Sequence, residues 1–530
     1  MNTELYIAKG KPFLTGDYLF FNAEFGDIIE YLFINSDGFG LMLDSPHPWI
    51  VRRDPNNGDP LLCIAVSNVS PYPQQANSNL PSNYYDISFI LKSSTDIRSL
   101  YQSFIGTIGQ EENQYRIPLA TAIPDERMFQ YPIWSTWAEY KKDINEKIVL
   151  DFAQQINNHG FPNAQIEIDE QWERYFGDST FDLRKFPNPK QLVARLHSMG
   201  FRVTFWMYPF INFDSTAYIE TNKVYLMKDR HHNNGGLLKA NWWEGSTTVI
   251  DFTNPLVADW YFNRLQLLQN ETGFDSYKFD AGEVRNYYGD SFDSFDSHVQ
   301  FEPSLLTTRY VETCFRFGRM IEVRSGYRTQ KLPIFVRMLD KTSDWSQDNG
   351  LKTLITTALT MSLAGYNFIL PDMIGGNAYG GNPSEELYIR WVQANAFLPS
   401  MQFSIPPWAY KNNKTIEISR KYVDLHVAHS DEIIRLAKKS TIDGQPLIRP
   451  MWYAEPDDIR TYSIGDQYML GDDIIVAPVL EQGQHERQVF LPTGDWVDSH
   501  GNKFYGPSVI TFKVPIEELL YFKRKHHTII

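Results

Sequence analysis

Carboxylate side chains follow several apolar segments in the middle of this chain. In the stretch "GFDSYKFDAGE", residues 277–279 have the bulk of a buried strand, and Asp280 and Glu283 come directly after them. The stretch "NAQIEIDEQW" places Glu167 and Asp169 near the end of another such segment, on one face because strand side chains alternate. Carboxylates at the end of a buried strand are candidates for catalytic or ligand-binding residues.

Further candidates lie later in the chain. The segment "LPIFVRML" carries Arg337 near its end and runs into a loop with three acids, Asp340, Asp344 and Asp348, between which position alone does not choose. Asp372 follows the apolar segment "YNFIL". A lone aspartate at a strand end serves equally well as a helix N-cap or a turn residue, so these acids also have a purely structural interpretation.

Paired acids of this kind suit the hydrolysis of glycosidic bonds. One carboxylate attacks the anomeric carbon, while a second, protonated carboxyl group donates to the leaving oxygen. The two groups lie about 5–5.5 Å apart in retaining enzymes and further apart in inverting ones. Five tryptophans are expected to converge on the same place: Trp134, Trp137, Trp206, Trp243 and Trp345. An acidic site walled by indole rings suits a neutral, polyhydroxylated ligand.

The elements that must position these residues follow a regular rhythm. From about residue 130, predicted strands alternate with predicted helices about eight times, which favours a (β/α)₈ barrel. The predicted strands cover residues 131–140, 163–172, 201–211, 274–283, 332–339, 366–370, 400–404 and 446–452. One of the predicted helices covers residues 304–323. In such barrels the C-terminal strand ends face the active site. The long connections 211–253 and 284–302 are expected on that face.

The flanking regions have a β character. Residues 1–122 contain a hairpin signal, "FINSDGFGLMLD", and predict an N-terminal β-sandwich. Residues 123–455 form the predicted catalytic barrel, and residues 456–530, with "DIIVAPVL" and "VITFKVP", predict a C-terminal β-sandwich. The predicted fold class is therefore α/β, a TIM barrel flanked by two β-sandwich domains.

Charge and composition exclude several classes of function. The net charge of −15 argues against a nucleic-acid partner, which requires gathered positive charge. The two cysteines, Cys63 and Cys314, make neither a disulfide framework nor a metal cluster, and we predict no metal and no cofactor. The sequence shows no signal peptide and no membrane span. The compartment stays open: a secretory or extracellular location if the start is incomplete, and the cytoplasm otherwise.

Several motifs resemble those of glycoside hydrolase family 31. "YKFDAGE" resembles the family's nucleophile motif, and "WSQDN" resembles its acid/base motif, usually W-x-G-D. "GSTTVIDFTNP", "YMLGDDIIVAPVL" and "FINSDGFGLMLD" are similar to other family segments, in family order from about residue 30 to 480. "PIWSTWAEYK", "KFDAGEV" and "FSIPPW" are most similar to the branch of myogenesis-regulating glycosidases, which implies α-galactosidase-like activity.

The resemblance assigns roles that spacing alone leaves open. It implies that Asp280 is the nucleophile and selects Asp348 as the acid/base from the three acids of its loop. The substrate-binding residues that we then predict are Trp134, Glu167, Asp169, Trp243, Lys278, Arg337, Trp345 and Asp372.

The chain departs from the family pattern in two places. Gln402, Phe403 and Ser404 stand where family α-glucosidases usually carry Arg-Asn-His, so a histidine that would contact the sugar is missing. Gln347 replaces a common glycine in the acid/base motif. The first departure argues against glucose specificity.

The sequence thus predicts a retaining exo-α-glycosidase that acts on terminal α-linked sugars, with α-galactosides as the expected substrates and a small-molecule, oligosaccharide or glycan as the ligand. The alternatives are an α-glucosidase, an α-xylosidase or a transglycosylase of the same family, and a catalytically inactive carbohydrate-binding protein. A metal-dependent barrel hydrolase would need histidines at the strand ends, where the pairs 231–232 and 526–527 do not fall.

Overall fold

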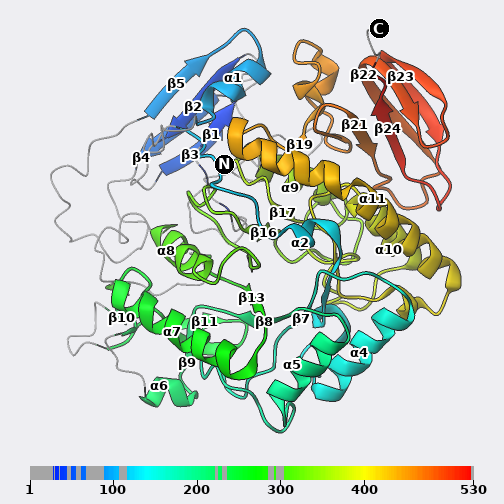
Figure 1. The fold of residues 1–530 in the computed structure, drawn as a ribbon. Helices are drawn as coiled ribbons and strands as arrows, with labels where there is room; N and C mark the ends of the chain where they lie inside the picture. Colours follow the sequence, from blue (N-terminus) through cyan, green and yellow to red (C-terminus); the bar gives the residue numbers. More distant parts are fainter. Residues whose placement is uncertain are drawn as a thin grey trace.

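The protein is described here by a computed structural model. The structure describes residues 28, 30, 32–34, 36, 38–43, 49–54, 61–66, 89–106, 116–220, 225–229, 236–283, 292–293 and 304–526. Figure 1 shows the antiparallel sheets near the two ends of the chain above the barrel, the N-terminal one at the upper left and the C-terminal one at the upper right.

The barrel is an eight-stranded parallel sheet with the order β17-β16-β15-β13-β8-β7-β6-β18. Its strands are β6 (Ile133–Ser135), β7 (Gln165–Ile168), β8 (Val203–Met207), β13 (Ser276–Phe279), β15 (Glu322–Val323), β16 (Phe335–Arg337), β17 (Ile369–Leu370) and β18 (Gln402–Phe403). A parallel bridge between Met373 and Gln402 joins the two ends of the sheet, and the Ile374 N–H donates to the Gln402 carbonyl at 2.8 Å. The predicted barrel is therefore confirmed as a closed ring.

The barrel differs from the prediction in two places: one of its strands was not expected, and one expected strand lies in another sheet. The sequence suggested a helix over residues 304–323, whereas helix α8 (Ser304–Phe315) ends earlier and β15 follows it as a barrel strand. The segment 446–452 was expected to close the barrel, but its strand β19 (Ile448–Arg449) pairs antiparallel with β20 (Tyr468–Leu470). Strands of two residues carry no periodicity, so tertiary pairing alone decides their partners.

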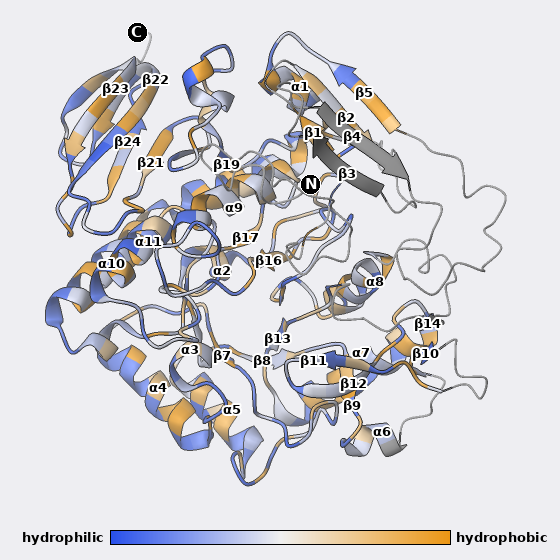
Figure 2. Cartoon of the chain, turned by 180° about the vertical axis from the view of Figure 1, so that it is seen from behind, coloured by the Kyte–Doolittle hydropathy of each residue, from blue (hydrophilic) through white to orange (hydrophobic). Residues whose placement is uncertain are grey.

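Helices surround the barrel and bury one face against it. They include α2 (Glu126–Gln130), α3 (Trp137–Tyr140), α4 (Glu146–Asn158), α5 (Pro189–Ser198), α7 (Pro255–Thr272), α9 (Lys352–Leu363), α10 (Glu385–Asn395) and α11 (Asn413–Asp443). In α4, Asn145 caps the first turn by accepting from the Ile148 N–H, and Val149, Phe152 and Ile156 are buried. Figure 2 shows hydrophobic and hydrophilic residues alternating along α4 and α5, as expected for helices with one buried face.

The long connection after β8 folds into a small sheet beside the barrel mouth. Strands β9 (Phe210–Asn212), β11 (Ala240–Trp242) and β12 (Gly245–Val249) pair antiparallel, and helix α6 (Thr216–Glu220) follows β9. Trp243 and Glu244 form the turn between β11 and β12. Strand β10 (Lys228–Asp229) pairs with β14 (Phe292–Asp293), which lies in the second predicted connection. The rest of residues 284–302 lies outside the described residues.

Antiparallel sheets flank the barrel. Strands β1 (Leu32–Ile34), β2 (Phe39–Leu43) and β5 (Phe89–Ser93) form one N-terminal sheet beside α1 (Ile97–Phe104), and β3 (Trp49–Asp54) pairs with β4 (Leu61–Val66). At the C-terminal end, β19, β20, β21 (Ile474–Ala477), β22 (Glu486–Asp498), β23 (Lys503–Lys513) and β24 (Leu520–Arg524) form one six-stranded sheet. The hairpin predicted near residue 36 is the β1–β2 pair. The predicted domain boundaries at residues 122 and 455 stay predictions.

Candidate active site

A cavity of about 550 Å³ opens at the C-terminal ends of the barrel strands. Its lining comes from the segments after β6, β7, β13, β15, β16 and β17, from β8, and from the turn between β11 and β12. The lining residues are Trp137, Lys142, Asp169, Glu170, Trp206, Trp243, Glu244, Lys278, Asp280, Arg324, Arg337, Leu339, Asp340, Asn349, Met373, Asn377 and Tyr379.

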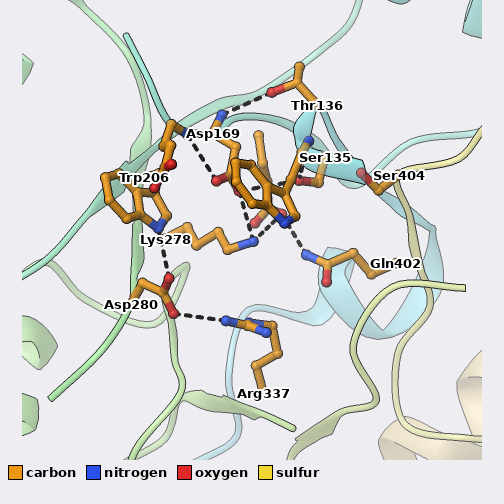
Figure 3. Close-up of polar contacts among 12 residues, drawn as sticks. Ser135, Thr136, Asp169, Trp206, Lys278, Asp280, Arg337, Gln402 and Ser404 are labelled. Carbon is orange, nitrogen blue, oxygen red and sulfur yellow. Dashed lines mark hydrogen bonds and ion pairs between the residues drawn. The ribbon is translucent and has the colours of Figure 1, made fainter. Parts of the chain in front are cut away.

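Asp280 lies in this cavity directly after β13. Arg337 donates to its Oδ1 at 2.8 Å, and Trp206 donates to its Oδ2 at 2.9 Å (Figure 3). Arg324 lies 3.2 Å from the same Oδ1. Burial alone would raise the pKa of Asp280, but the positive charges of Arg324 and Arg337 outweigh it and lower the pKa below its usual value. Asp280 is therefore an ionised carboxylate in an almost completely buried position.

The structure explains why Ala-Gly-Glu follows Asp280 in the motif. Ala281 and Gly282 both have positive φ angles, 56° and 90°. A Cβ on Gly282 would lie 2.5 Å from the ring of Tyr310, whose hydroxyl donates to the Asp280 carbonyl at 2.9 Å. Glu283 then binds Arg324 at 2.5 Å. The second acid of the motif thus holds one of the two cations that keep Asp280 ionised.

Arg337 connects several of the acids predicted from the sequence. Besides Asp280, its guanidinium group contacts Asp340 and Asp372, both at 3.0 Å, and Glu322 at 3.4 Å. Burial would raise the pKa of Asp340, but the charges of Arg337 and Arg324 prevail and lower it. Asp340 therefore stays ionised at neutral pH and is poorly suited to donate a proton.

Below the cavity, Lys278 is surrounded by carboxylates. Its Nζ lies 3.0 Å from Asp169, 3.9 Å from Glu322 and 4.0 Å from Glu167. Burial would lower the pKa of Lys278, but these acids raise it overall. The Gln402 amide donates to Glu167 at 2.5 Å and is directed into this layer (Figure 3). Gln402, the first of the three residues that stand in place of the family's Arg-Asn-His run, thus supports the floor of the cavity.

The structure brings Asp169, Trp243, Lys278, Asp280 and Arg337 together in the cavity. Two other predicted residues, Glu167 and Asp372, are fully buried beside it and contact Gln402 and Arg337 respectively. They support the cavity lining rather than form it.

Trp134 is not placed where the prediction required. It is fully buried, its ring stacks on Phe403 with centroids 4.8 Å apart, and its indole N–H donates to the Pro162 carbonyl at 3.1 Å. Alternation along β6 turns Trp134 towards the helix layer, while the next residue, Ser135, donates to Asp169 at 3.4 Å. An indole without exposed surface cannot pack on a sugar, so the expectation for Trp134 is corrected.

The loop that carries Asp348 reaches the cavity with only some of its side chains. Asp348 is exposed, Trp345 is half-buried against the barrel core, and neither belongs to the cavity lining. The next residue, Asn349, does line the cavity, and its amide donates to the Asp340 carbonyl at 2.6 Å. The loop therefore reaches the cavity, with Asp348 at its outer side.

Sequence reasoning missed several cavity residues. Arg324 comes directly after a helix that was predicted too long, and Lys142 and Tyr379 belong to loops without a motif. The same overlong helix hid Glu322, which is buried beneath the cavity. Glu170 is adjacent to Asp169, lines the same cavity and could have been found from that position.

The described part of the chain holds no group of three or more His, Cys, Asp or Glu side chains arranged to bind a metal ion. Among the described helices, we find none that combines the length and the hydropathy needed to cross a membrane.

Comparison with known proteins places the chain in a family. Residues 127–431 match the TIM-barrel domain of glycosyl hydrolases family 31, and residues 444–529 match the C-terminal domain of that family. The chain is 34% identical to the myogenesis-regulating glycosidase of Mus musculus, over 97% of this chain and 71% of that protein. It is 26% identical to the SITS-binding protein of Tetronarce californica, over 98% of this chain and 71% of that protein.

The fold agrees with these matches. A family 31 dextranase of Flavobacterium johnsoniae, solved with isomaltotriose, superposes with a TM-score of 0.79 at 20% identity and covers 96% of this chain. This chain spans 63% of that dextranase chain. With its barrel and C-terminal domain both matched, the chain belongs to glycoside hydrolase family 31.

Proposed function

We propose that this protein is a retaining exo-α-glycosidase that hydrolyses terminal α-galactosides by double displacement. The observation that carries the proposal is Asp280, a carboxylate held ionised inside the cavity by Arg337 and Arg324. An ionised carboxylate at the strand end is the group that a nucleophilic attack on an anomeric carbon requires.

In the first step, an Asp280 oxygen forms a bond to C1 while the bond from C1 to the leaving oxygen breaks. Asp348 donates its proton to that oxygen, and a covalent glycosyl–Asp280 ester remains. In the second step, Asp348 accepts a proton from water, the water oxygen bonds to C1, and Asp280 leaves. Two inversions at C1 retain the α configuration of the released sugar.

The surroundings of the loop acids support Asp348 as the acid/base. Asp340 is bound by Arg337 and stays ionised, as described above. Asp344 accepts from the Ser346 N–H at 2.8 Å and so belongs to the internal turn of the loop. Asp348 is exposed beside Asn349, which lines the cavity. Asp348 is therefore the loop acid that is neither paired with Arg337 nor part of the internal turn of the loop.

The charges of the cavity favour a neutral sugar. Each of the four cations that line it is paired with a carboxylate: Lys142 with Glu244, Lys278 with Asp169, and Arg324 and Arg337 with Asp280. An anionic sugar would have to displace one of these pairs, whereas a neutral sugar can share their donors and acceptors.

Galactose specificity rests on two observations. The family branch that is most similar by motif has α-galactosidase-like activity. Ser404 stands where the sugar-binding histidine of family α-glucosidases is usually found, and its hydroxyl oxygen accepts from the Ala138 N–H at 2.5 Å. Both argue against a glucose site of the usual family type.

A panel of p-nitrophenyl α-glycosides of galactose, glucose, xylose and sulfoquinovose tests the proposal, with Asp280→Ala as the control. We expect the galactoside to be hydrolysed with the highest kcat/KM and proton NMR to detect the α anomer first. Faster hydrolysis of the glucoside or the xyloside would assign the protein a different sugar specificity within the same family. Turnover retained by Asp280→Ala, or sugar binding without turnover in the wild type, would contradict the proposed function.

A further inference from the structure

A cluster of three charged side chains lines one side of the cavity and has no role in the mechanism above. Lys142 Nζ contacts Glu244 Oε1 and lies 3.4 Å from Glu170 Oε1. The indole N–H of Trp243 donates to Glu170 Oε2 at 3.3 Å, so this tryptophan is attached to the same cluster. Lys142, Glu170 and Glu244 are called the rim cluster below.

The rim cluster joins buried and accessible groups. The side chains of Glu170 and Glu244 are only 3% and 10% exposed, while that of Lys142 is 44% exposed. Apart from its 3.4 Å ion-pair contact with Lys142 Nζ, Glu170 Oε1 makes no hydrogen bond within the described part of the chain. A nearly buried oxygen without such a bond, on the wall of a cavity, is a site for a hydrogen bond from a ligand.

The protonation of Glu170 adds a donor to this wall. Burial and the neighbouring negative charges of Glu244 and Asp169 raise the pKa of Glu170 to about 9. At neutral pH the cluster therefore comprises a neutral carboxyl group and a Lys142–Glu244 ion pair. Such a set offers both donors and acceptors and has no net charge, which suits sugar hydroxyl groups.

The barrel topology decides which part of the sugar these groups can reach. In the closed ring of strands, β7, which precedes Glu170, lies four strands from β16, which precedes the Asp348 loop, in either direction. Lys142 follows β6, and Glu244 belongs to the insertion after β8, the two neighbours of β7. The rim cluster and the Asp348 loop therefore lie on opposite sides of the cavity.

A bound sugar must direct its glycosidic oxygen towards Asp348 and its C1 towards Asp280. In a pyranose ring C4 lies across from C1, with C5 and its hydroxymethyl group beside C4. The edge that carries C4 and C6 consequently faces the side of the cavity formed after β6, β7 and β8.

We infer that Lys142, Glu170 and Glu244 determine specificity by binding the hydroxyl groups on the C4–C6 edge of the hexose whose C1 is attacked by Asp280. This inference rests on the proposed function for the orientation of the sugar. It also gives a reason for exo action, because the cluster and Trp243 occupy the space into which a further sugar on C4 or C6 would extend.

The experiment compares the hexose that the protein accepts best with its 4-deoxy and 6-deoxy forms. Binding of the free sugars is measured by isothermal titration calorimetry, and kcat/KM is measured for the corresponding p-nitrophenyl α-glycosides. The variants are Glu170→Gln, Glu244→Gln and Lys142→Met. The control is Glu432→Gln, a surface residue on α11 that pairs with Arg435.

We expect the rim variants to lose about tenfold to a hundredfold in affinity and in kcat/KM for the full hexose. For one of the two deoxy sugars, the loss should be at least fivefold smaller, because the hydroxyl that the cluster binds is already missing. The control should change neither quantity. Because Lys142 is half exposed, we expect Lys142→Met to fold. This variant therefore still allows the hexose to be compared with its deoxy forms if a glutamate variant folds poorly.

The inference would be overturned if the rim variants lost affinity and kcat/KM equally for the hexose and for both deoxy sugars, or if they lost neither. A different result would contradict the proposed function: a wild-type protein that binds the hexose but hydrolyses no glycoside. In that case the calorimetric binding measurements still test whether the rim cluster binds the sugar.

Discussion

The guanidinium group of Arg337 lies 2.8 Å from the carboxylate of Asp280, and both side chains are almost completely buried. Their pairing joins the ends of two barrel strands, β13 and β16, which are 58 residues apart from Phe279 to Arg337 (337 − 279). It also determines the charge state of the proposed nucleophile, because Asp280 would otherwise favour its protonated form in this buried place.

Replacing Arg337 by Met should therefore shift the pH dependence of activity. Without Arg337 the pKa of Asp280 rises, so the acid limb of the profile of kcat/KM against pH moves to higher pH. We also expect a loss of roughly 3–5 kcal/mol in the free energy of unfolding, since buried carboxylates lose their cation. The pH profile and urea unfolding measure the two effects. Arg435→Met, which breaks a surface pair with Glu432, is the control and should leave both nearly unchanged.

Gly282→Ala should impair the position of Asp280. The new Cβ would lie 2.5 Å from the Tyr310 ring at a φ of 90°, and Tyr310 holds the Asp280 carbonyl. We expect kcat/KM to fall at least tenfold and the free energy of unfolding to fall by about 1–3 kcal/mol.

Gly273→Ala provides the matched control for Gly282→Ala. Gly273 has a φ of 88°, but nothing lies within 4 Å of the position that a Cβ would take there. The control should lose only about 1 kcal/mol of stability and retain its activity. Identical behaviour of the two variants would show that the contact with Tyr310 is unimportant.

Lys278→Met should leave three buried carboxyl groups, on Glu167, Asp169 and Glu322, without their shared cation. We expect a destabilisation of roughly 3–5 kcal/mol near neutral pH. The folded variant then binds protons more tightly than its unfolded chain, so the deficit in stability shrinks as the pH falls towards 5. Thermal unfolding of the variant and the wild type from pH 8 to pH 5 tests this; a deficit that stays constant with pH would refute the explanation.

Glu173 should make the stability of the wild-type protein depend on pH. It is buried, accepts hydrogen bonds from Tyr208 and from the Ser179 N–H, and burial raises its pKa from 4.5 to about 7. The stability contributed by the protonated form is fully present below pH 4.5 and is lost as the pH rises through about 7.

The size of this loss is at most about 3 kcal/mol, the free-energy equivalent of the raised pKa. In Glu173→Gln the pH-dependent part should disappear, so its Tm should fall less than that of the wild type between pH 5 and pH 8. Differential scanning calorimetry measures the difference, with Glu432→Gln as the surface control. An unchanged Tm difference across this range would show that Glu173 does not titrate there.

The barrel and the strand that leads to Asp280 could be predicted because their signals are local. Tyr277 and Phe279 alternate with Lys278 and Asp280, so the sequence itself separates the side chains that face the helices from those that face the cavity. The neighbouring β15 could not be predicted in this way. It has two residues, and only its pairing with β13 and β16 makes Glu322 part of the floor.

The same limit applies to single side chains. Trp134 and Trp206 both precede strand ends in the sequence, yet Trp134 packs against Phe403 in the core while Trp206 donates to Asp280. The difference is the face of the strand on which each side chain falls, and that depends on how the barrel closes.

The order of the motifs along the chain was enough to determine the family and the barrel and to select Asp280 as the proposed nucleophile, because these depend on local patterns and on their order. The charge of Asp280, the support given by Glu283 through Arg324, and the grouping of Lys142, Glu170 and Glu244 were decided only by the tertiary structure. Each of them depends on side chains brought within a few ångströms from separate strands, and electrostatic interactions change with those distances and with burial.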